Sequence, residues 1–265
     1  MNNLINPNLL LPILNDKRSG SQDLLIKINK ILLKNIKRRE SLNRIISIFK
    51  KSFSEFQVIN SNLVKYEKLL QKNQLKQLEN YLKESSHYFE DTYQTIFKKL
   101  YSCYSQSDFI FTLSNSRTII EVLKLWKHQN KNIKVTVCES RPKFEGRFAA
   151  KELAKYGLDT TLITEALMAK FVPQVDLVLI GADKILKDGG VINKTGSLSS
   201  AIIAKYYKKP FVVAASKEKI SQQTNSLIKE ENPREILSDQ IKKLNPVNIY
   251  FEVIAKSLIT KIVTD

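Results

Sequence analysis

Apolar side chains recur every three or four positions through roughly the first hundred residues, the spacing of helices that bury one face. The first such run comprises Leu24, Leu25, Ile28, Ile31, Leu32 and Ile36. The same spacing returns up to Leu100, and no glycine or proline interrupts the chain between Gly20 and Pro142. The pattern predicts a bundle of about four helices over residues 20–104, with Ser21 as the N-cap of the first.

Beyond residue 104 the pattern changes to short apolar runs separated by helical stretches. The runs predict strands over residues 108–113, 133–138, 160–163, 176–180 and 210–214, with a sixth over 248–253. Strands that alternate with helices form a mostly parallel sheet covered on both faces. We therefore predict an α/β protein: a helical N-terminal domain (1–107), followed by a Rossmann-like ligand-binding domain with a mostly parallel sheet (108–265).

Composition narrows the classes of function. The formal charge is +17, but acidic residues are interleaved and no zinc finger or aromatic-basic module appears, so we expect a solvated basic surface and no direct nucleic-acid binding. Two cysteines and two histidines are too few for a disulfide scaffold or most histidine metal sites, so we predict no metal and no cofactor. The longest apolar runs are about five residues, and the N-terminus has no signal-peptide pattern, which indicates a cytoplasmic protein without a membrane span.

In open parallel sheets, ligands bind beyond the carboxyl ends of the strands. The polar residues that follow the predicted strands are Ser114, Asn115, Arg117, Glu139, Arg141, Asp183, Asn193, Lys194 and Lys219. Six of the seven glycines lie between Gly146 and Gly196, in the same region. Such groups suit a small phosphorylated, hydroxylated ligand, although each residue alone could equally serve a turn or a helix cap. The two glycine patterns typical of nucleotide binding, Gly-x-Gly-x-x-Gly and Gly-x-x-x-x-Gly-Lys-Ser, do not occur in the sequence.

Three motifs resemble those of one superfamily. They are the segments 137–142 (VCESRP), 181–184 (GADK) and 190–197 (GVINKTGS). The superfamily contains the alpha, beta and delta regulatory subunits of translation initiation factor 2B, methylthioribose-1-phosphate isomerase and ribose-1,5-bisphosphate isomerase. The match covers about residues 108–264. The resemblance implies a helical domain, a Rossmann-like domain that forms a homodimer, and a pocket for a sugar phosphate or nucleotide.

The superfamily contains catalytic and regulatory members, and the residues after the first strand distinguish them. The isomerases have a cysteine in a Thr-His-Cys context and pair it with the aspartate of Gly-Ala-Asp. Here Ser114 takes the place of the cysteine and Leu113 that of the histidine, while Asp183 remains. A serine hydroxyl is far less acidic than a thiol, whose pKa is near 8.5. Cys138 is a weaker candidate for a displaced thiol.

The segment Ser116-Arg117 resembles the Tyr-Ser-Arg turn of the alpha subunit. The resemblance thus implies a non-catalytic regulatory protein that senses a sugar phosphate or nucleoside monophosphate and acts in guanine-nucleotide exchange on initiation factor 2. The alternative is a sugar-phosphate aldose–ketose isomerase with an altered acid, in which Asp183 would be the catalytic residue. A third, weaker hypothesis is an RNA-associated protein that has lost the pocket.

The residues have separate roles in this interpretation. Phosphate contacts are predicted for Arg117, Arg141, Lys194 and Lys219, hydroxyl contacts for Asp183 and Asn193, and the pocket floor for Ser114 and Asn115. The isomerases' Arg-Gly-Ala phosphate turn is only partly matched by residues 17–21, which argues against tight binding of a second phosphate; alternatively, this segment caps the first helix. Expected partners are a second copy or a larger homo-oligomer, with initiation factor 2 and other exchange-factor subunits as further candidates.

Overall fold

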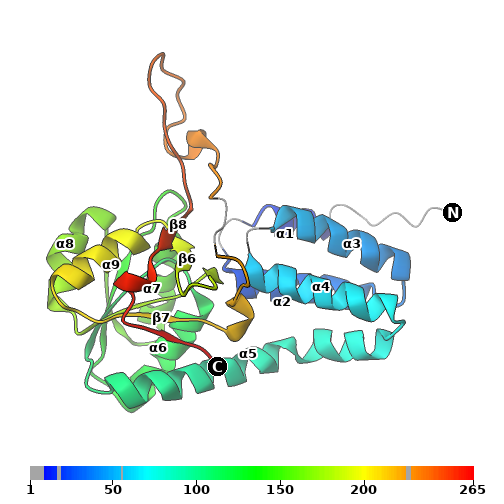
Figure 1. Cartoon of the computed structure of the whole chain (residues 1–265), viewed down its shortest axis with the longest axis horizontal. Coiled ribbons are helices and arrows are strands. Elements are labelled where there is room, and N and C mark those ends of the chain that lie inside the picture. The colour runs from blue at the N-terminus through cyan, green and yellow to red at the C-terminus, as the bar shows by residue number, and fades with distance from the viewer. Residues whose placement is uncertain (1–8, 17–18, 55, 225–227) are drawn as a thin grey trace. The chain divides into compact units, whose positions relative to one another are not determined.

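The computed structural model describes residues 9–16, 19–54, 56–224 and 228–265 (Figure 1). The chain divides into two compact units, Met1–Thr92 and Tyr93–Asp265. Helix α5 (Leu75–Tyr104) runs through the boundary between them. The predicted domain boundary after residue 107 lies in the loop beyond α5 and stays a prediction. No helix in the described part of the chain is long and apolar enough to cross a membrane.

The first unit is helical, as the periodicity predicts. Its elements are α1 (Leu11–Leu14), α2 (Ser21–Lys34), α3 (Arg39–Ser52), α4 (Gln57–Gln71) and the first part of α5. Gly20, not Ser21, is the N-cap of α2, because Gly20 is the last residue with an extended backbone (φ −67°, ψ 165°) and Ser21 is already helical. Just before it, Ser19 donates to Asp16 from its backbone N (3.0 Å) and its hydroxyl (2.7 Å). The apolar stripe of α2 is buried, with Ile28 and Leu32 both fully inaccessible.

The second unit contains a six-stranded parallel sheet with the order β3-β2-β1-β4-β7-β9. Its strands are β1 (Phe109–Leu113), β2 (Lys134–Cys138), β3 (Asp159–Ile163), β4 (Leu177–Ile180), β7 (Phe211–Ala214) and β9 (Lys261–Val263). The chain builds outward from β1 in one direction and then from β4 in the other. This is the doubly wound order, and the strand order reverses between β1 and β4. The predicted Rossmann-like fold is confirmed.

The sixth strand is not the predicted one. Residues 248–253 were expected to complete the main sheet, but β8 (Phe251–Ile254) joins β5 (Lys184–Ile185) and β6 (Val191–Lys194) in a separate three-stranded sheet. β8 belongs to the smaller sheet because it pairs with β6, to which it runs antiparallel, with Glu252 opposite Asn193. The short strand β9 occupies the sixth position instead.

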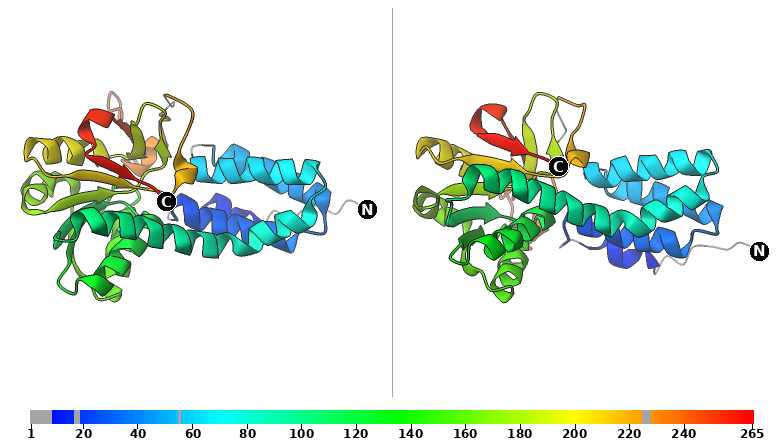
Figure 2. Two further views of the ribbon diagram at one scale, coloured as in Figure 1. Left: turned by 60° about the horizontal axis from the view of Figure 1, so that its bottom comes forward. Right: turned by 90° about the horizontal axis from the view of Figure 1, so that it is seen from below.

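Helices cover both faces of the main sheet (Figure 2). Successive side chains of a strand point to opposite faces, so a strand covered on both sides must be apolar throughout. In β1, Ile110 packs into a core with residues of α5, α6 (Arg117–Gln129) and α7 (Glu145–Lys155). Its neighbour Phe111 packs into the opposite core, with α8 (Met168–Phe171) and α9 (Ser197–Tyr206). This arrangement explains the unbroken apolar runs in the sequence.

Short 3-10 helices complete the second unit: η2 (Glu165–Leu167), η3 (Val172–Gln174), η4 (Lys217–Lys219), η5 (Pro233–Glu235) and η6 (Lys256–Leu258). In the figure, the segment from residue 228 to residue 248 extends away from the sheet as an arm (orange and red in Figure 1). It carries exposed apolar side chains, among them Ile241, Leu244 and Val247. After the arm, the chain enters the three-stranded sheet as β8.

Glu252 connects strand β8 of the smaller sheet to the start of helix α9. Its Oε1 accepts the backbone N–H groups of Gly196 and Leu198, both at 2.7 Å, and so caps the N-terminus of α9. We expect Glu252→Ala to lower the free energy of unfolding by about 1–2 kcal/mol, because two helix-terminal donors lose their acceptor. Glu252→Gln keeps an acceptor oxygen and should lose less. Urea denaturation checks both, and equal losses would contradict the capping role.

Candidate functional site

The candidate site begins where the strand order reverses, at the carboxyl ends of β1 and β4. The loops after these strands touch: a Cβ added at Gly181 would lie 2.5 Å from the Ser116 hydroxyl oxygen, so only glycine fits there. Ser114 follows β1 with a φ of +66°, a conformation that costs a non-glycine residue free energy. Its backbone N–H donates to the hydroxyl of Ser140, at 2.8 Å. The loop after β1 is therefore held to the loop after β2.

The loop after β2 is tightly built around Ser140. The Ser140 backbone N–H donates to the Glu165 carboxylate (2.7 Å), and its hydroxyl donates to the Cys138 carbonyl (3.2 Å). Helix α7 starts close beneath, since a Cβ on Gly146 would lie 1.7 Å from the same carbonyl oxygen. These contacts fix the backbone on both sides of Arg141.

Asp183 follows β4, and its carboxyl interacts with the charges of two lysines, Lys219 and Lys194. The Lys219 side chain is 6% exposed, and its ammonium donates to the carbonyl of Ala182. Burial raises the pKa of the Asp183 carboxyl above its usual range, and the positive charges of Lys219 and Lys194 only partly offset this. Burial likewise lowers the pKa of Lys219, against the opposing charge of Asp183. A carboxyl whose pKa is raised and an amine whose pKa is lowered can both exchange protons closer to neutral pH.

Asn193 and Lys194 are brought to the same region by β6. The Lys194 ammonium donates to Glu145 Oε1 at 2.8 Å, and the two side chains are only 4% and 14% exposed. Asn193 Nδ2 donates to the hydroxyl of Ser197, at 2.9 Å. Both residues therefore have protein partners and are buried near the candidate acid–base group.

Three residues close to Lys194 were not predicted from the sequence: Tyr250, its partner Glu235, and Glu145. The Tyr250 hydroxyl donates to Glu235 Oε2, and burial together with this bond raises the pKa of Tyr250. The Lys143 and Lys194 ammonium groups lie 3.7 Å and 4.9 Å from the centre of the Tyr250 ring. Glu145 could have been found from its place at the start of the helix after β2. Tyr250 gave no signal, because only the β6–β8 pairing brings it here.

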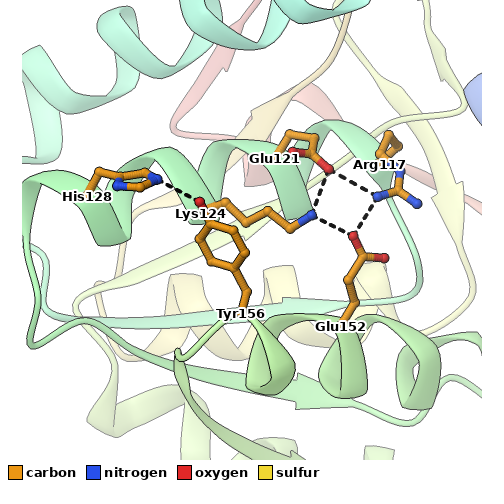
Figure 3. Close-up of polar contacts among 6 residues, drawn as sticks. All are labelled: Arg117, Glu121, Lys124, His128, Glu152 and Tyr156. Atoms are coloured by element: carbon orange, nitrogen blue, oxygen red, sulfur yellow. Dashed lines mark hydrogen bonds and ion pairs between the residues drawn. The ribbon is translucent and has the colours of Figure 1, made fainter.

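Arg117 lies in a different cluster from the one predicted (Figure 3). Its Nη1 contacts Glu121 Oε1 (3.1 Å) and Glu152 Oε1 (2.6 Å). The Lys124 ammonium contacts the same two oxygens, at 2.9 Å and 2.7 Å. We call these four side chains the ion-pair ring. It joins α6 to α7 and uses the guanidinium that sequence analysis assigned to phosphate.

The remaining two predicted residues belong to the loop after β2. Glu139 is paired with Arg147, whose Nε and Nη2 donate to Glu139 Oε2 at 3.0 Å and 2.6 Å. Arg141 is exposed, and its guanidinium carbon lies 5.1 Å from the centre of the Phe144 ring. Across the described residues, no ion pair or hydrogen bond holds the Arg141 side chain. It is therefore available to an anionic ligand.

Neither cysteine compensates for Ser114. Cys138 is buried, and burial raises its pKa far above the range in which a thiolate forms, as expected for a poor candidate. Cys103 is exposed on α5, where Lys261 donates to its sulfur at 3.0 Å and lowers its pKa.

Other predicted features can be placed as follows. The described residues hold no group of three or more His, Cys, Asp or Glu side chains suited to a metal ion. His128 lies on the surface and shares a hydrogen bond with the Tyr156 hydroxyl at 2.6 Å (Figure 3). The side chain of His87, and the residues Lys17 and Arg18, lie outside the described part of the chain.

Comparison with known proteins gives consistent results. The model of the initiation factor 2 subunit family matches residues 10–265. Ribose 1,5-bisphosphate isomerase of Archaeoglobus fulgidus is 34% identical over 162 residues, which are 59% of this chain and 52% of that protein. Methylthioribose-1-phosphate isomerase of Bacillus cereus is 32% identical over 184 residues, which are 62% of this chain and 52% of that protein. The chain thus spans about half the length of the curated relatives it matches.

A solved structure shows the same fold over nearly the whole chain. It is that of the Pyrococcus horikoshii OT3 translation initiation factor eIF-2B, with a TM-score of 0.82 at 23% identity, covering 98% of this chain and 96% of that one. At this identity the likeness establishes the architecture of both units.

Proposed function

The chain belongs to the initiation factor 2 subunit family, and from this premise we propose that its second unit binds a phosphorylated sugar and interconverts the aldose and ketose forms. The observation that supports the proposal best is Asp183, a carboxyl with a raised pKa beside Lys219 and Lys194 at the reversal of strand order. The curated relatives favour this alternative over the regulatory function that sequence analysis placed first.

The proposed chemistry is proton transfer between adjacent carbons. In an open-chain aldose whose C1 oxygen is free, such as ribose 5-phosphate, the Asp183 carboxylate removes the proton from C2, and the C–H electron pair becomes the double bond of an enediol. The same carboxyl then returns a proton to C1, while the proton on the C2 hydroxyl moves to the C1 oxygen. No oxidant or reductant is needed, because one carbon is reduced as its neighbour is oxidised. The positive charges of Lys219 and Lys194 would stabilise the negative oxygen that develops.

The pH dependence tests this assignment. Asp183 must be ionised to accept a proton, so kcat/KM should rise as pH increases through its raised pKa. Lys219 must be protonated, so kcat/KM should fall again as pH increases through the pKa of Lys219. Because burial lowers that pKa, the fall should come at a lower pH than for an ordinary lysine. We expect a bell-shaped profile whose two apparent values belong to the coupled pair. An acid limb near the ordinary aspartate value of about 3.9 would contradict the assignment.

A direct experiment separates the candidate functions. The purified chain is incubated with ribose 1,5-bisphosphate, methylthioribose 1-phosphate or ribose 5-phosphate, and binding is measured by thermal shift and conversion by NMR. Conversion to a ketose supports the proposal. Binding without conversion overturns it in favour of the regulatory function. Absence of both contradicts any sugar-phosphate function and leaves the third hypothesis, which salt-dependent RNA binding would support.

The regulatory function is the second candidate, and Ser114 is the observation that favours it. A family member without a thiol at this position has lost one acid–base group, and ligand binding could instead select one assembly state. We propose that such a protein would act with a second copy of itself and with initiation factor 2 or other exchange-factor subunits, in the cytoplasm. Size measurement by light scattering, with and without ribose 5-phosphate, tests the assembly.

A further inference from the structure

The two edges of the main sheet differ in how well they are protected against pairing with a further strand. The edge strand β9 has only three residues and begins with the exposed Lys261, and short edge strands and edge lysines both discourage such pairing. The opposite edge strand, β3, has five residues and contains no lysine, proline or glycine. Its first four residues are exposed or half-buried. β3 is therefore the open edge of the sheet.

The pairing of β3 with β2 determines which backbone groups of β3 point outward. The two strands are parallel along the whole of β3, and the ladder continues where the N–H of Glu139 donates to the carbonyl of Ile163, at 2.8 Å. In a parallel ladder, alternate residues direct both backbone groups to the same neighbour. Thr161 and Ile163 therefore face β2, whereas Thr160 and Leu162 direct their N–H and C=O groups away from it. Within the described part of the chain, no strand pairs with these four groups.

The side chains beside these groups leave apolar surface exposed. Ile163 packs into the core that contains α8 and α9, so Leu162 points to the opposite face, which α7 covers. Leu162 is 46% exposed, and Phe148 of α7 is 37% exposed. Leu167, in η2 just after β3, is 41% exposed. A strand that added to β3 would cover apolar surface in addition to pairing with the backbone.

The charges around this edge favour an acidic partner. Lys151 and Lys155 on α7 and Lys134 at the start of β2 are exposed, and no ion pair among the described residues includes them. Of the nearby carboxylates, Asp159 begins β3 and Glu165 is bonded to the loop after β2. The whole chain has a formal charge of +17, so two copies that met at this edge would repel each other, whereas an acidic segment would be attracted.

We propose that β3 binds an extended acidic segment of a partner protein, which adds to the six-stranded sheet as a further strand. In this mode of recognition, main-chain hydrogen bonds provide the affinity and alternate side chains provide the specificity. The outward groups of Thr160 and Leu162 supply two donors and two acceptors, and the lysines beside them select the charge of the partner. The proposal does not depend on the sugar-phosphate function.

The first test compares three labelled peptides on the full chain by fluorescence anisotropy, at constant ionic strength. The acidic peptide alternates threonine and valine in its centre and has two glutamates at each end, and it should show saturable binding. The same peptide with N-methylated amides keeps its charge but loses its N–H donors, so it should bind at least 30-fold more weakly. Equal binding of the two would show attraction by charge alone and overturn the proposal, as would no binding of either.

The third peptide has lysines in place of the glutamates. It should bind at least 10-fold more weakly than the acidic peptide, because its charges are repelled by the basic rim of the edge. Binding that equals that of the acidic peptide would overturn the assignment of an acidic partner.

Variants of β3 provide the second test. Leu162→Pro removes one outward N–H and keeps the groups that bond to β2, and edge strands tolerate proline, so binding of the acidic peptide should weaken about 10-fold or more. Thr161→Val is the matched control: its backbone faces β2, and the dissociation constant should stay within about threefold. A larger loss for Thr161→Val than for Leu162→Pro would overturn the proposal.

Two further measurements complete the test. The double variant Lys151→Glu, Lys155→Glu leaves β3 unchanged and should weaken binding of the acidic peptide about 10-fold, so it serves if the proline variant does not fold. Light scattering without peptide tests the other occupant of the edge. A dimer that Leu162→Pro dissociates would show that β3 pairs with a second copy, and it would overturn the assignment of an acidic partner.

Discussion

Asp183→Asn should reduce kcat/KM for the proposed isomerisation by about 10³-fold, within the range that a general acid–base group contributes. The amide has the same shape but cannot accept a proton from carbon. The backbone N–H of Asp183 would still donate to the Ile192 carbonyl (2.9 Å), so the turn after β4 should keep its form. The dissociation constant should change far less than the rate. Single-turnover kinetics by NMR, combined with calorimetric binding, measure the two effects separately.

Asp188→Asn is the matched control for this substitution. Asp188 is exposed, and its Oδ1 accepts the backbone N–H of Gly190 at 2.8 Å, a contact that an asparagine oxygen can make. The control should retain full activity. An Asp183→Asn protein that folds, binds and still turns over within about tenfold of the parent would show that the proton is moved by another group.

Much of the fold follows from local sequence because the central strands of the main sheet are buried on both faces. β4 and β7 are four-residue apolar runs, and all of their residues are buried. β9 could not be predicted, because Lys261, Ile262 and Val263 form too short a run to show periodicity. The position of β8 depends on its pairing with β6, which begins 60 residues earlier (Val191 against Phe251) and involves no local pattern.

The site could be predicted to the extent that it depends on strand ends. Asp183 and Lys219 are coupled by charge, and they follow β4 and β7, parallel strands that end at one edge of the main sheet. Lys194 joins them from β6 of the smaller sheet. The phosphate contact of Arg117 stays a prediction, but the ion pairs of its side chain did not follow from its place at the start of α6 alone. Glu121, four residues later, is a helical ion-pair partner that the spacing does indicate. The second partner, Glu152, comes from α7, and only the packing of the two helices brings it there.

Ser114→Cys should increase the rate of isomerisation by about 100-fold, since it restores a thiol where the resemblance places one. A thiol with a pKa near 8.5 can move a proton at neutral pH, which a serine hydroxyl cannot do without a strong base. The substitution should be tolerated, because the contact that holds this residue to Ser140 is made by the Ser114 backbone N–H and not by its hydroxyl. The gain should grow with pH as the thiolate fraction increases.

The Ser114→Cys substitution both removes a hydroxyl and adds a thiol. Ser114→Ala distinguishes these two effects, because it removes the hydroxyl without adding a thiol. We expect it to leave the rate within a fewfold of the parent, and we expect the combined variant Ser114→Cys, Asp183→Asn to be inactive, because one acid–base group cannot replace the other. A cysteine variant no faster than the alanine variant would contradict the view that residue 114 limits the chemistry. If the parent chain binds ribose 5-phosphate without turnover and only the cysteine variant converts it, the serine marks a site that kept its ligand and lost its reaction. That result would favour the regulatory function, with Asp183 and Arg141 serving in recognition alone.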